Sequence, residues 1–359
     1  MNPDRLWTIA RLELTQRVRT VSWYVLLGVF ALLLIVVTVL AFLSFGYIDD
    51  RGPGVYSTVV YLTLLLAVLV SPTLSGNSIN GDRDAATLAP VQVTLATTGE
   101  ILLGKLLAAW ITGLAFVVVA VPFLLVAMLG GGVQVGTVLV SIVVLVVEIG
   151  VVAGIGVGLS GILARPLFSV ATTYLVVAAF VVGTVIAFGL GGASATSEVV
   201  AKNRMAEYDP DTGAPLCRDG SADCWDEPQL MLCGQWETST YRVPRFDRVW
   251  WMLAANPFVI LADATPTQYD EHGNPIDLFG QLKAGVRYAQ LPPPLETAWD
   301  ECDPVSEEPR TPAEVVAETV PSWFVGLGIQ VVVAAGLLWG GWARTRTPAR
   351  TPPPGTRIA

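Results

Sequence analysis

The sequence predicts an all-α integral membrane protein: a six-helix transmembrane bundle with a large disulfide-containing extracytoplasmic segment between helices five and six. Hydrophobic residues make up 53% of the 359 residues and charged residues only 14%, whereas soluble domains carry roughly a quarter charged residues. The mean hydropathy of +0.59 indicates more apolar surface than one soluble core can bury. Most of the acidic residues and all four cysteines lie in one long stretch, about 193–321, in the C-terminal half.

The apolar residues form six blocks, each long enough to cross a hydrocarbon core about 30 Å thick as a helix. Helices are expected because backbone groups in lipid must be hydrogen-bonded within each segment, and no barrel-like alternation is visible. The predicted spans are 22–45, 55–74, 106–129, 135–163, 167–190 and 323–342.

Lys and Arg residues near the ends of the spans predict the orientation, because they stay on the cytoplasmic side. They cluster before the first span, after the last, and in the connections that contain Arg83, Lys105 and Arg165. Both termini are therefore predicted to be cytoplasmic. The predicted domains are a cytoplasmic amphipathic helix (1–21), transmembrane helices one to five (22–192), an extracytoplasmic domain (193–320), the sixth transmembrane helix (321–342) and a cytoplasmic basic tail (343–359).

All four cysteines lie in the extracytoplasmic segment, on the side predicted to be oxidising. Two disulfides are the natural expectation there, although the sequence leaves three pairings open. A zinc site is the alternative, but the spacings lack a CxxC pattern and His272 is the only histidine. The candidates are Cys217, Cys224, Cys233 and Cys302.

Two glycine patterns resemble nucleotide-binding motifs, and neither has the context that such a motif needs. The stretch from Gly99 to Lys105 fits GxxxxGK, but Leu106 follows where a P-loop requires Ser or Thr. Thr97 and Glu100 instead form a capping-box pattern that would start a helix. The GxGxxG match from Gly156 to Gly161 lies inside the fourth span, where small residues favour close helix packing. We therefore expect no catalytic residue and no bound metal.

Glu148 is the one ionisable residue deep inside a predicted span. Such a residue costs several kcal/mol unless it faces the bundle interior, pairs or is protonated. It is a candidate for the translocation path. The alternative is a structural hydrogen bond to a neighbouring helix, for example near Thr172 or Thr173.

Three stretches of the chain are similar to permeases of the ABC-2 family of bacterial exporters. The first combines an acidic stretch, a Thr-Leu pair and a Pro-containing turn with an "ILLGK" helix start. The second is a small-residue helix end followed by a short charged turn, and the third is an Asn-Pro-Phe before the final helix. They are Asp82-Arg83-Asp84-Ala85-Ala86-Thr87-Leu88-Ala89-Pro90 with Glu100-Ile101-Leu102-Leu103-Gly104-Lys105, then Gly158-Leu159-Ser160-Gly161-Ile162-Leu163-Ala164-Arg165-Pro166, and Asn256-Pro257-Phe258.

The resemblance implies a permease subunit in a bacterial cell membrane, with the lipid bilayer around it and no nucleic-acid partner. An ABC ATPase subunit would bind ATP-Mg, so this chain would bind no cofactor, and a second permease copy or a paralogue would complete the unit. The loop 76–104 would couple to the ATPase, and helix 1–21 would form an elbow beside it. The candidate coupling residues are Asp82, Arg83, Asp84, Thr87, Glu100 and Lys105.

Alternatives stay open at several points. Loop 76–104 can instead be a solvated loop, and helix 1–21 a basic flank that only sets orientation. Trp250 and Trp251 suit a membrane interface, a core helix of the outer domain or a re-entrant helix. The whole chain can also be a scaffold or sensor that presents the outer domain. An ATP-independent carrier is disfavoured by the lack of a visible internal repeat.

Overall fold

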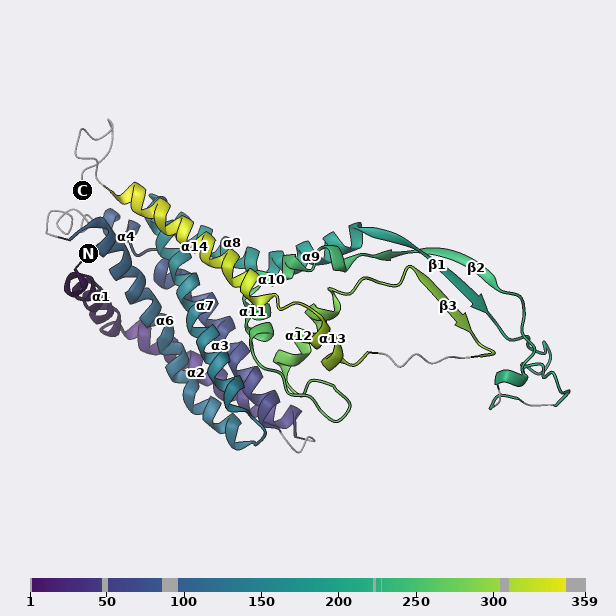
Figure 1. The fold of residues 1–359 in the computed structure, drawn as a ribbon. Coiled ribbons are helices and arrows are strands. Elements are labelled where there is room, and N and C mark those ends of the chain that lie inside the picture. Colours follow the sequence, from purple (N-terminus) through teal and green to yellow (C-terminus); the bar gives the residue numbers. More distant parts are fainter. Residues whose placement is uncertain are drawn as a thin grey trace.

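The computed structural model describes residues 2–46, 51–85, 96–221, 224–226, 228–303 and 310–346. Within these residues, six helical segments are long and apolar enough to span a membrane, and all six lie where the sequence predicts them. The chain is therefore a multi-pass membrane protein (Figure 1). The spans are α2 (Val21–Ser44), α3 (Gly52–Ser75) with α4 (Asn80–Asp84), α6 (Thr98–Leu129), α7 (Val135–Ile162), α8 (Pro166–Ala178) with the π-helical turn η1 (Ala179–Gly183) and α9 (Thr184–Ser194), and α14 (Trp323–Thr345).

The third span begins eight residues before its predicted apolar start. Helix α6 starts at Thr98 because Thr97 and Glu100 form the capping box that the sequence indicates. The Thr97 hydroxyl accepts from the Glu100 N–H at 3.3 Å, and the Glu100 carboxylate accepts from the Thr97 N–H at 2.9 Å. Two N–H groups that a helix start would otherwise leave unpaired are thus satisfied.

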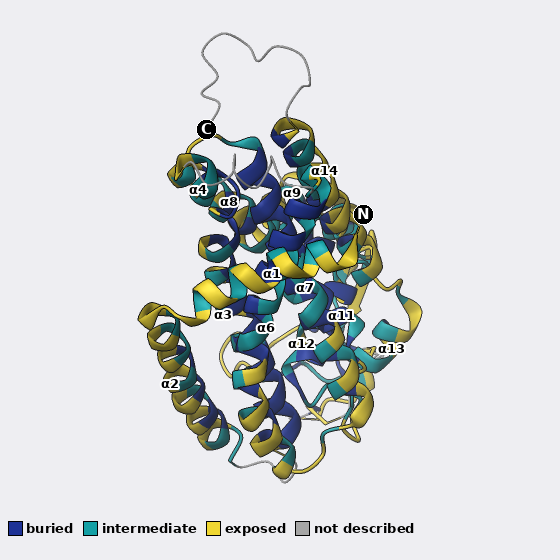
Figure 2. Ribbon diagram, turned by 90° about the vertical axis from the view of Figure 1, so that its left-hand side faces the viewer, coloured by how far each residue is buried: buried dark blue, intermediate teal, exposed yellow. Residues whose placement is uncertain are grey.

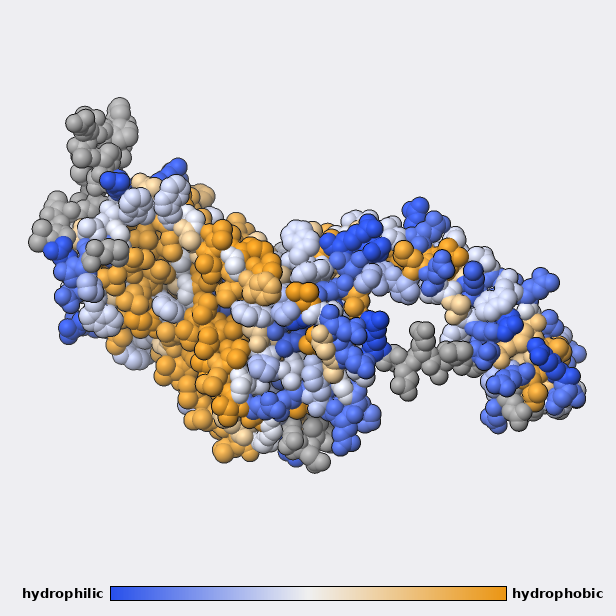
Figure 3. Space-filling model, in the orientation of Figure 1, coloured by the Kyte–Doolittle hydropathy of each residue, from blue (hydrophilic) through white to orange (hydrophobic). Residues whose placement is uncertain are grey.

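The bundle is built around α3 and α7. Within the most apolar stretch of each span, 61% of the residues are buried in α3 and 56% in α7, against 22% in α2 and 11% in the α8–α9 segment. Exposed faces, shown in yellow in Figure 2, follow much of α2. These faces carry large apolar side chains, and Figure 3 shows hydrophobic residues gathered over the bundle. Lipid is the environment that such a surface requires.

Glycines bring α7 and α14 into close contact. A Cβ on Gly158 would lie 2.6 Å from the backbone carbonyl carbon of Leu337, and one on Gly161 would lie 2.7 Å from the Cα of Gly341. Gly156 is equally confined by Ser75, because a Cβ there would lie 1.9 Å from the hydroxyl oxygen. The glycines of the GxGxxG match therefore serve helix packing.

We expect Gly158→Ala to destabilise the protein by about 1–3 kcal/mol, the usual cost of overpacking a closely packed site. Thermal unfolding of the purified protein in detergent, followed by circular dichroism, would measure the effect. Gly336→Ala on α14 is the matched control, since a Cβ there meets nothing within 4 Å. Equal melting temperatures for the two variants would contradict this account of the helix contact.

Among the described residues between the fifth and sixth spans, four segments form short α-helices. Although α11 is too short to span a membrane, Ile260 and Leu261 on it belong to the same hydrophobic core as residues of α3, α6 and α7. Trp251 on α10 is half exposed. The segment after the paired tryptophans therefore enters the bundle core. The helices are α10 (Trp251–Ala254), α11 (Pro257–Ala264), α12 (Leu278–Tyr288) and α13 (Pro312–Glu318).

Asn256 anchors this segment to the fifth span. Its side-chain oxygen caps α11 by accepting from the Phe258 N–H at 3.0 Å, while its Nδ2 donates to the Val181 carbonyl at 2.8 Å and to the Thr184 hydroxyl at 3.0 Å. Val181 lies in η1, and a π-helical turn changes which carbonyls are bonded within the helix. One amide thus joins two elements far apart in the sequence.

A small β-sheet corrects the all-α expectation. Strands β1 (Thr196–Arg204), β2 (Glu237–Pro244) and β3 (Glu296–Asp300) form a sheet in the order β2-β1-β3. β1 pairs with β2 in antiparallel register and with β3 in parallel register. Strand β1 follows α9 almost at once, and Figure 1 shows the β1–β2 ribbon extending away from the bundle. None of the three strands is predicted from the sequence, although the β-branched residues of β1 and β2 favour strands.

Both expected disulfides are present, in a lobe at the far end of the ribbon. We define the disulfide lobe as residues 205–236 together with Cys302. Cys217 pairs with Cys224, and Cys233 pairs with Cys302. The lobe buries only a few side chains, among them Ala206 and Met231. Because so small a core stabilises little, the disulfides carry much of the lobe's stability.

The two disulfides are expected to differ in their contribution. Cys233 and Cys302 are 69 residues apart and Cys217 and Cys224 only 7, so loop-closure entropy favours the first by about 2 kcal/mol. Cys233→Ser with Cys302→Ser should therefore make the lobe more sensitive to protease than Cys217→Ser with Cys224→Ser. Limited proteolysis of the purified protein checks this, and faster cleavage of the second variant would contradict it.

Candidate functional site

A cluster of charges around a buried lysine lies at the end of the bundle where α1 (Pro3–Val18) and the last turns of α14 are found (Figure 1). Lys105 on α6 is 4% exposed, and its Nζ contacts the carboxylates of Glu13 on α1 and of Asp82 on α4, the latter at 2.6 Å. One buried ammonium group therefore joins three elements. We call Glu13, Asp82 and Lys105 the Lys105 cluster.

Helix α1 lies across the end of the bundle and packs on α6. The approach is close because Gly104 has no side chain: a Cβ there would lie 2.9 Å from the Cβ of Ile9. The Asn2 N–H donates to the Glu100 carboxylate at 2.6 Å, which ties the start of α1 to the start of α6. At the other end of α1, Arg17 donates to the Leu74 carbonyl at 2.6 Å. That carbonyl lies in the last turn of α3, where carbonyls lack helical partners.

Ser160 extends the connection from this end of the bundle to α7. Its hydroxyl donates to the Asn80 side-chain oxygen at 3.0 Å and accepts from the N–H groups of Ile79 and Asn80, at 2.9 Å and 3.1 Å. Ser160 and Asn80 are both fully buried. The turn between α3 and α4 is thereby fixed to the helix that packs most closely on α14.

The structure brings together some of the predicted coupling residues. Asp82 and Lys105 form an ion pair, and Glu100 holds the start of α6 one turn before Lys105. Arg83 and Asp84 also lie on α4, where Asp84 is exposed. Thr87 lies outside the described residues.

Glu13 and Arg17 were missed as site residues. Both lie in the predicted amphipathic helix 1–21, and in the structure both contact the bundle, Glu13 through Lys105 and Arg17 through the Leu74 carbonyl. Ala10, about one helical turn before Glu13, is fully buried, while Trp7 is 52% exposed. The spacing from Glu13 to Arg17, one turn of helix, would have placed them on one face, but nothing in the sequence indicates which way that face points.

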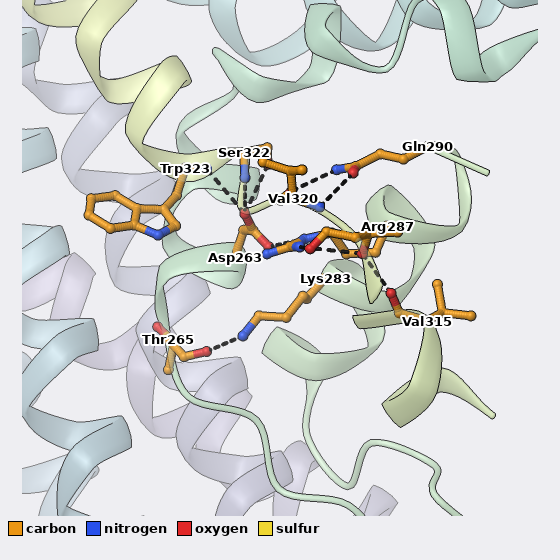
Figure 4. A network of polar contacts seen from close by, with 10 residues as sticks. Asp263, Thr265, Lys283, Arg287, Gln290, Val315, Val320, Ser322 and Trp323 are labelled. Atoms are coloured by element: carbon orange, nitrogen blue, oxygen red, sulfur yellow. Dashed lines mark hydrogen bonds and ion pairs between the residues drawn. The ribbon is translucent and has the colours of Figure 1, made fainter. Parts of the chain in front are cut away.

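A second buried network lies at the opposite end of the bundle, around Asp263 on α11 (Figure 4). Its Oδ1 accepts from the Arg287 guanidinium on α12 at 2.7 Å. Its Oδ2 accepts from the N–H groups of Ser322 and Trp323, at 2.5 Å and 3.1 Å, just where α14 begins. These bonds hold α11, α12 and the start of α14 together. Neither Asp263 nor Arg287 is predicted as a site residue from the sequence.

Lys283 on α12 completes this network. Its Nζ donates to the Thr265 carbonyl at 2.6 Å. Burial lowers the pKa of the Lys283 ammonium, and the nearby Asp263 carboxylate opposes this shift. The network orders the segment that leads into the sixth span: Arg287 forms an ion pair with Asp263, and the Lys283 ammonium is bound by a backbone carbonyl.

Glu148 lies fully buried on α7, away from both clusters. The polar side chain beside it is that of Gln330 on α14, which lines the same small cavity. The Thr172 and Thr173 hydroxyls, which the sequence suggested as partners, donate instead to the carbonyls of Phe168 and Ser169 in their own helix.

Comparison with known proteins adds no assignment. No protein-family model matches the sequence, and no curated protein sequence matches it.

We expect Lys105→Met to destabilise the protein, because it leaves two acidic groups without their shared cation. Breaking a buried pair costs about 3–5 kcal/mol, and the lower end applies here because the Asp82 side chain is 35% exposed. Thermal unfolding in detergent would measure the loss. The neutral combination Lys105→Met, Glu13→Gln and Asp82→Asn should recover most of it. A combination less stable than Lys105→Met alone would overturn the assignment of the cluster.

Proposed function

We propose that the chain is the permease subunit of an ABC-type exporter, driven by ATP hydrolysis in a separate ATPase subunit. The permease unit would contain a second copy of the chain or a paralogue. The bundle end with the Lys105 cluster would face the cytoplasm of a bacterial cell, and the disulfide lobe would lie outside. This chain would itself bind no ATP-Mg and catalyse no reaction.

The Lys105 cluster is the observation that carries the proposal. An exporter needs an element that a partner can push and that transmits the movement into the spans. Helices α1 and α4 are joined to α6 through Lys105, and the turn before α4 is joined to α7 through Ser160. Because separating buried charges is costly, these elements would move as one body. Arg83 and Asp84 would provide the outer contact with the ATPase.

A scaffold or sensor is the second candidate function, and the outer segment favours it. The β1–β2 ribbon holds the disulfide lobe far from the bundle (Figure 1). Trp225 and Trp236 in the lobe are about half exposed, at 54% and 47%, and exposed aromatic residues are common at binding surfaces. In this reading the spans anchor the lobe and no ATPase binds.

Purification in a mild detergent, with identification of the co-purifying proteins, separates the two functions. We expect an ATPase subunit to accompany the unmodified chain and to be lost with Arg83→Ala and Asp84→Ala. Asp82 is left intact because its change would disturb Lys105. The matched control is Arg310→Ala with Glu318→Ala, which removes one basic and one acidic residue, both exposed, next to α13 on the side of the bundle away from α4.

Each outcome decides between the proposals. An ATPase that is retained by the control and lost by the Arg83 and Asp84 variant supports the exporter and places the contact on α4. An ATPase that is retained by both variants contradicts the α4 contact. Recovery of no ATPase with the unmodified chain, under conditions that preserve other membrane complexes, contradicts the exporter.

A further inference from the structure

Two acceptor groups face one another in the middle of the bundle. Both carboxylate oxygens of Glu148 on α7 are buried without a hydrogen-bond donor, and the side-chain oxygen of Gln330 on α14 is also buried without one. Glu148 is 0% exposed and Gln330 is 2% exposed. The two side chains line one cavity of about 10 Å³.

The orientation of the Gln330 amide follows from its other contact. Its Nε2 donates one of its two N–H groups to the Ala255 carbonyl at 2.9 Å, which fixes the side of the amide that carries the nitrogen, and the Gln330 oxygen has no donor. An ionised carboxylate can only accept hydrogen bonds, whereas a protonated one carries an O–H donor. One proton on Glu148 therefore supplies the donor that the Gln330 oxygen lacks, and it removes an uncompensated charge from an apolar site.

The surroundings offer no other compensation for a charge. The cavity is lined from α3 by Val68, from α8 by Val177, from η1 by Phe180 and Val181, and from α11 by Pro257. Within the part of the chain that the structure describes, Glu148 is the only titratable or charged residue on the cavity wall. Lys105 and Asp263 belong to the clusters at the two ends of the bundle.

The size of the cavity excludes any ligand larger than about one water molecule. A volume of about 10 Å³ is at the lower limit for a single water molecule. A metal cation needs several oxygen ligands, and no group of three or more His, Cys, Asp or Glu residues occurs among the described residues. A proton needs one acceptor, which Glu148 provides.

We propose that Glu148 is a proton-binding site, and that its proton donates a hydrogen bond to Gln330 and holds α14 against α7. Gln330 donates to the carbonyl of Ala255, the residue just before the N-cap of α11. The proton therefore links α7, α14 and the start of α11. Loss of the proton to water leaves a carboxylate that must be hydrated, and the cavity admits that water only when α14 moves away from α7. This inference goes beyond the proposed export function and does not depend on an ATPase.

Infrared spectroscopy of the full chain in lipid nanodiscs tests proton binding directly. At neutral pH we expect one protonated-carboxyl carbonyl band that shifts in D₂O and is lost in Glu148→Gln, a change that keeps the shape and supplies an N–H donor to Gln330. Gln330→Leu should shift the band by removing its acceptor. Identical carboxyl regions for the unmodified chain and Glu148→Gln would overturn the proposal.

A cysteine pair tests the linked movement of the helices. A Cβ on Gly154 would lie 3.6 Å from the Cβ of Ala334, a separation that a disulfide can bridge. The Gly154→Cys and Ala334→Cys pair is made once with Glu148 present and once with Glu148→Gln. At alkaline pH we expect the disulfide to form severalfold more slowly in the protein that keeps Glu148. The Glu148→Gln protein corrects for thiol ionisation, because its residue 148 does not titrate. The same pH profile in both proteins would overturn the movement of α14.

Discussion

The structure depends on one constraint: a polar group inside an apolar bundle must find its partner within the protein, because lipid offers none. Lys105, Asp263 and Asn256 each satisfy it by bonding elements that are distant in the sequence. Since an unpaired buried charge is costly, these contacts position helices that apolar packing alone would leave free to slide. The positions of α1, α4, α11 and the start of α14 all follow from them.

Different helix pairs in the bundle are held by different forces. Ionic and hydrogen-bonded contacts position α1, α4, α11 and the start of α14, whereas the last turns of α7 and α14 are brought together by glycines such as Gly158 and Gly161. Glycine contacts are close and carry no charge. Glu148 on α7 and Gln330 on α14 belong to the same pair of helices. The proposed loss of the Glu148 proton would therefore act on the contact between α7 and α14.

The outer segment follows another physical rule. It has too few buried apolar residues to form a large core, so disulfides constrain the lobe, and β1 pairs with strands that lie far along the chain. Arg204 on β1 and Asp300 on β3 form an ion pair that adds to this pairing. The bundle is thus stabilised by helix packing within the membrane, whereas the outer segment is stabilised by disulfides and by backbone hydrogen bonds between strands.

The sequence by itself determined the six spans, the capped start of α6 and the presence of the disulfides. These features depend on residues close together in the chain or on the apolar content of a single segment. Only the tertiary structure decided that Cys233 pairs with Cys302, that Glu13 and Arg17 face the bundle, and that Gln330 lies beside Glu148. Each of these contacts joins residues that are far apart in the sequence. No local sequence pattern specifies which distant group will complete the hydrogen bonds of a buried polar side chain.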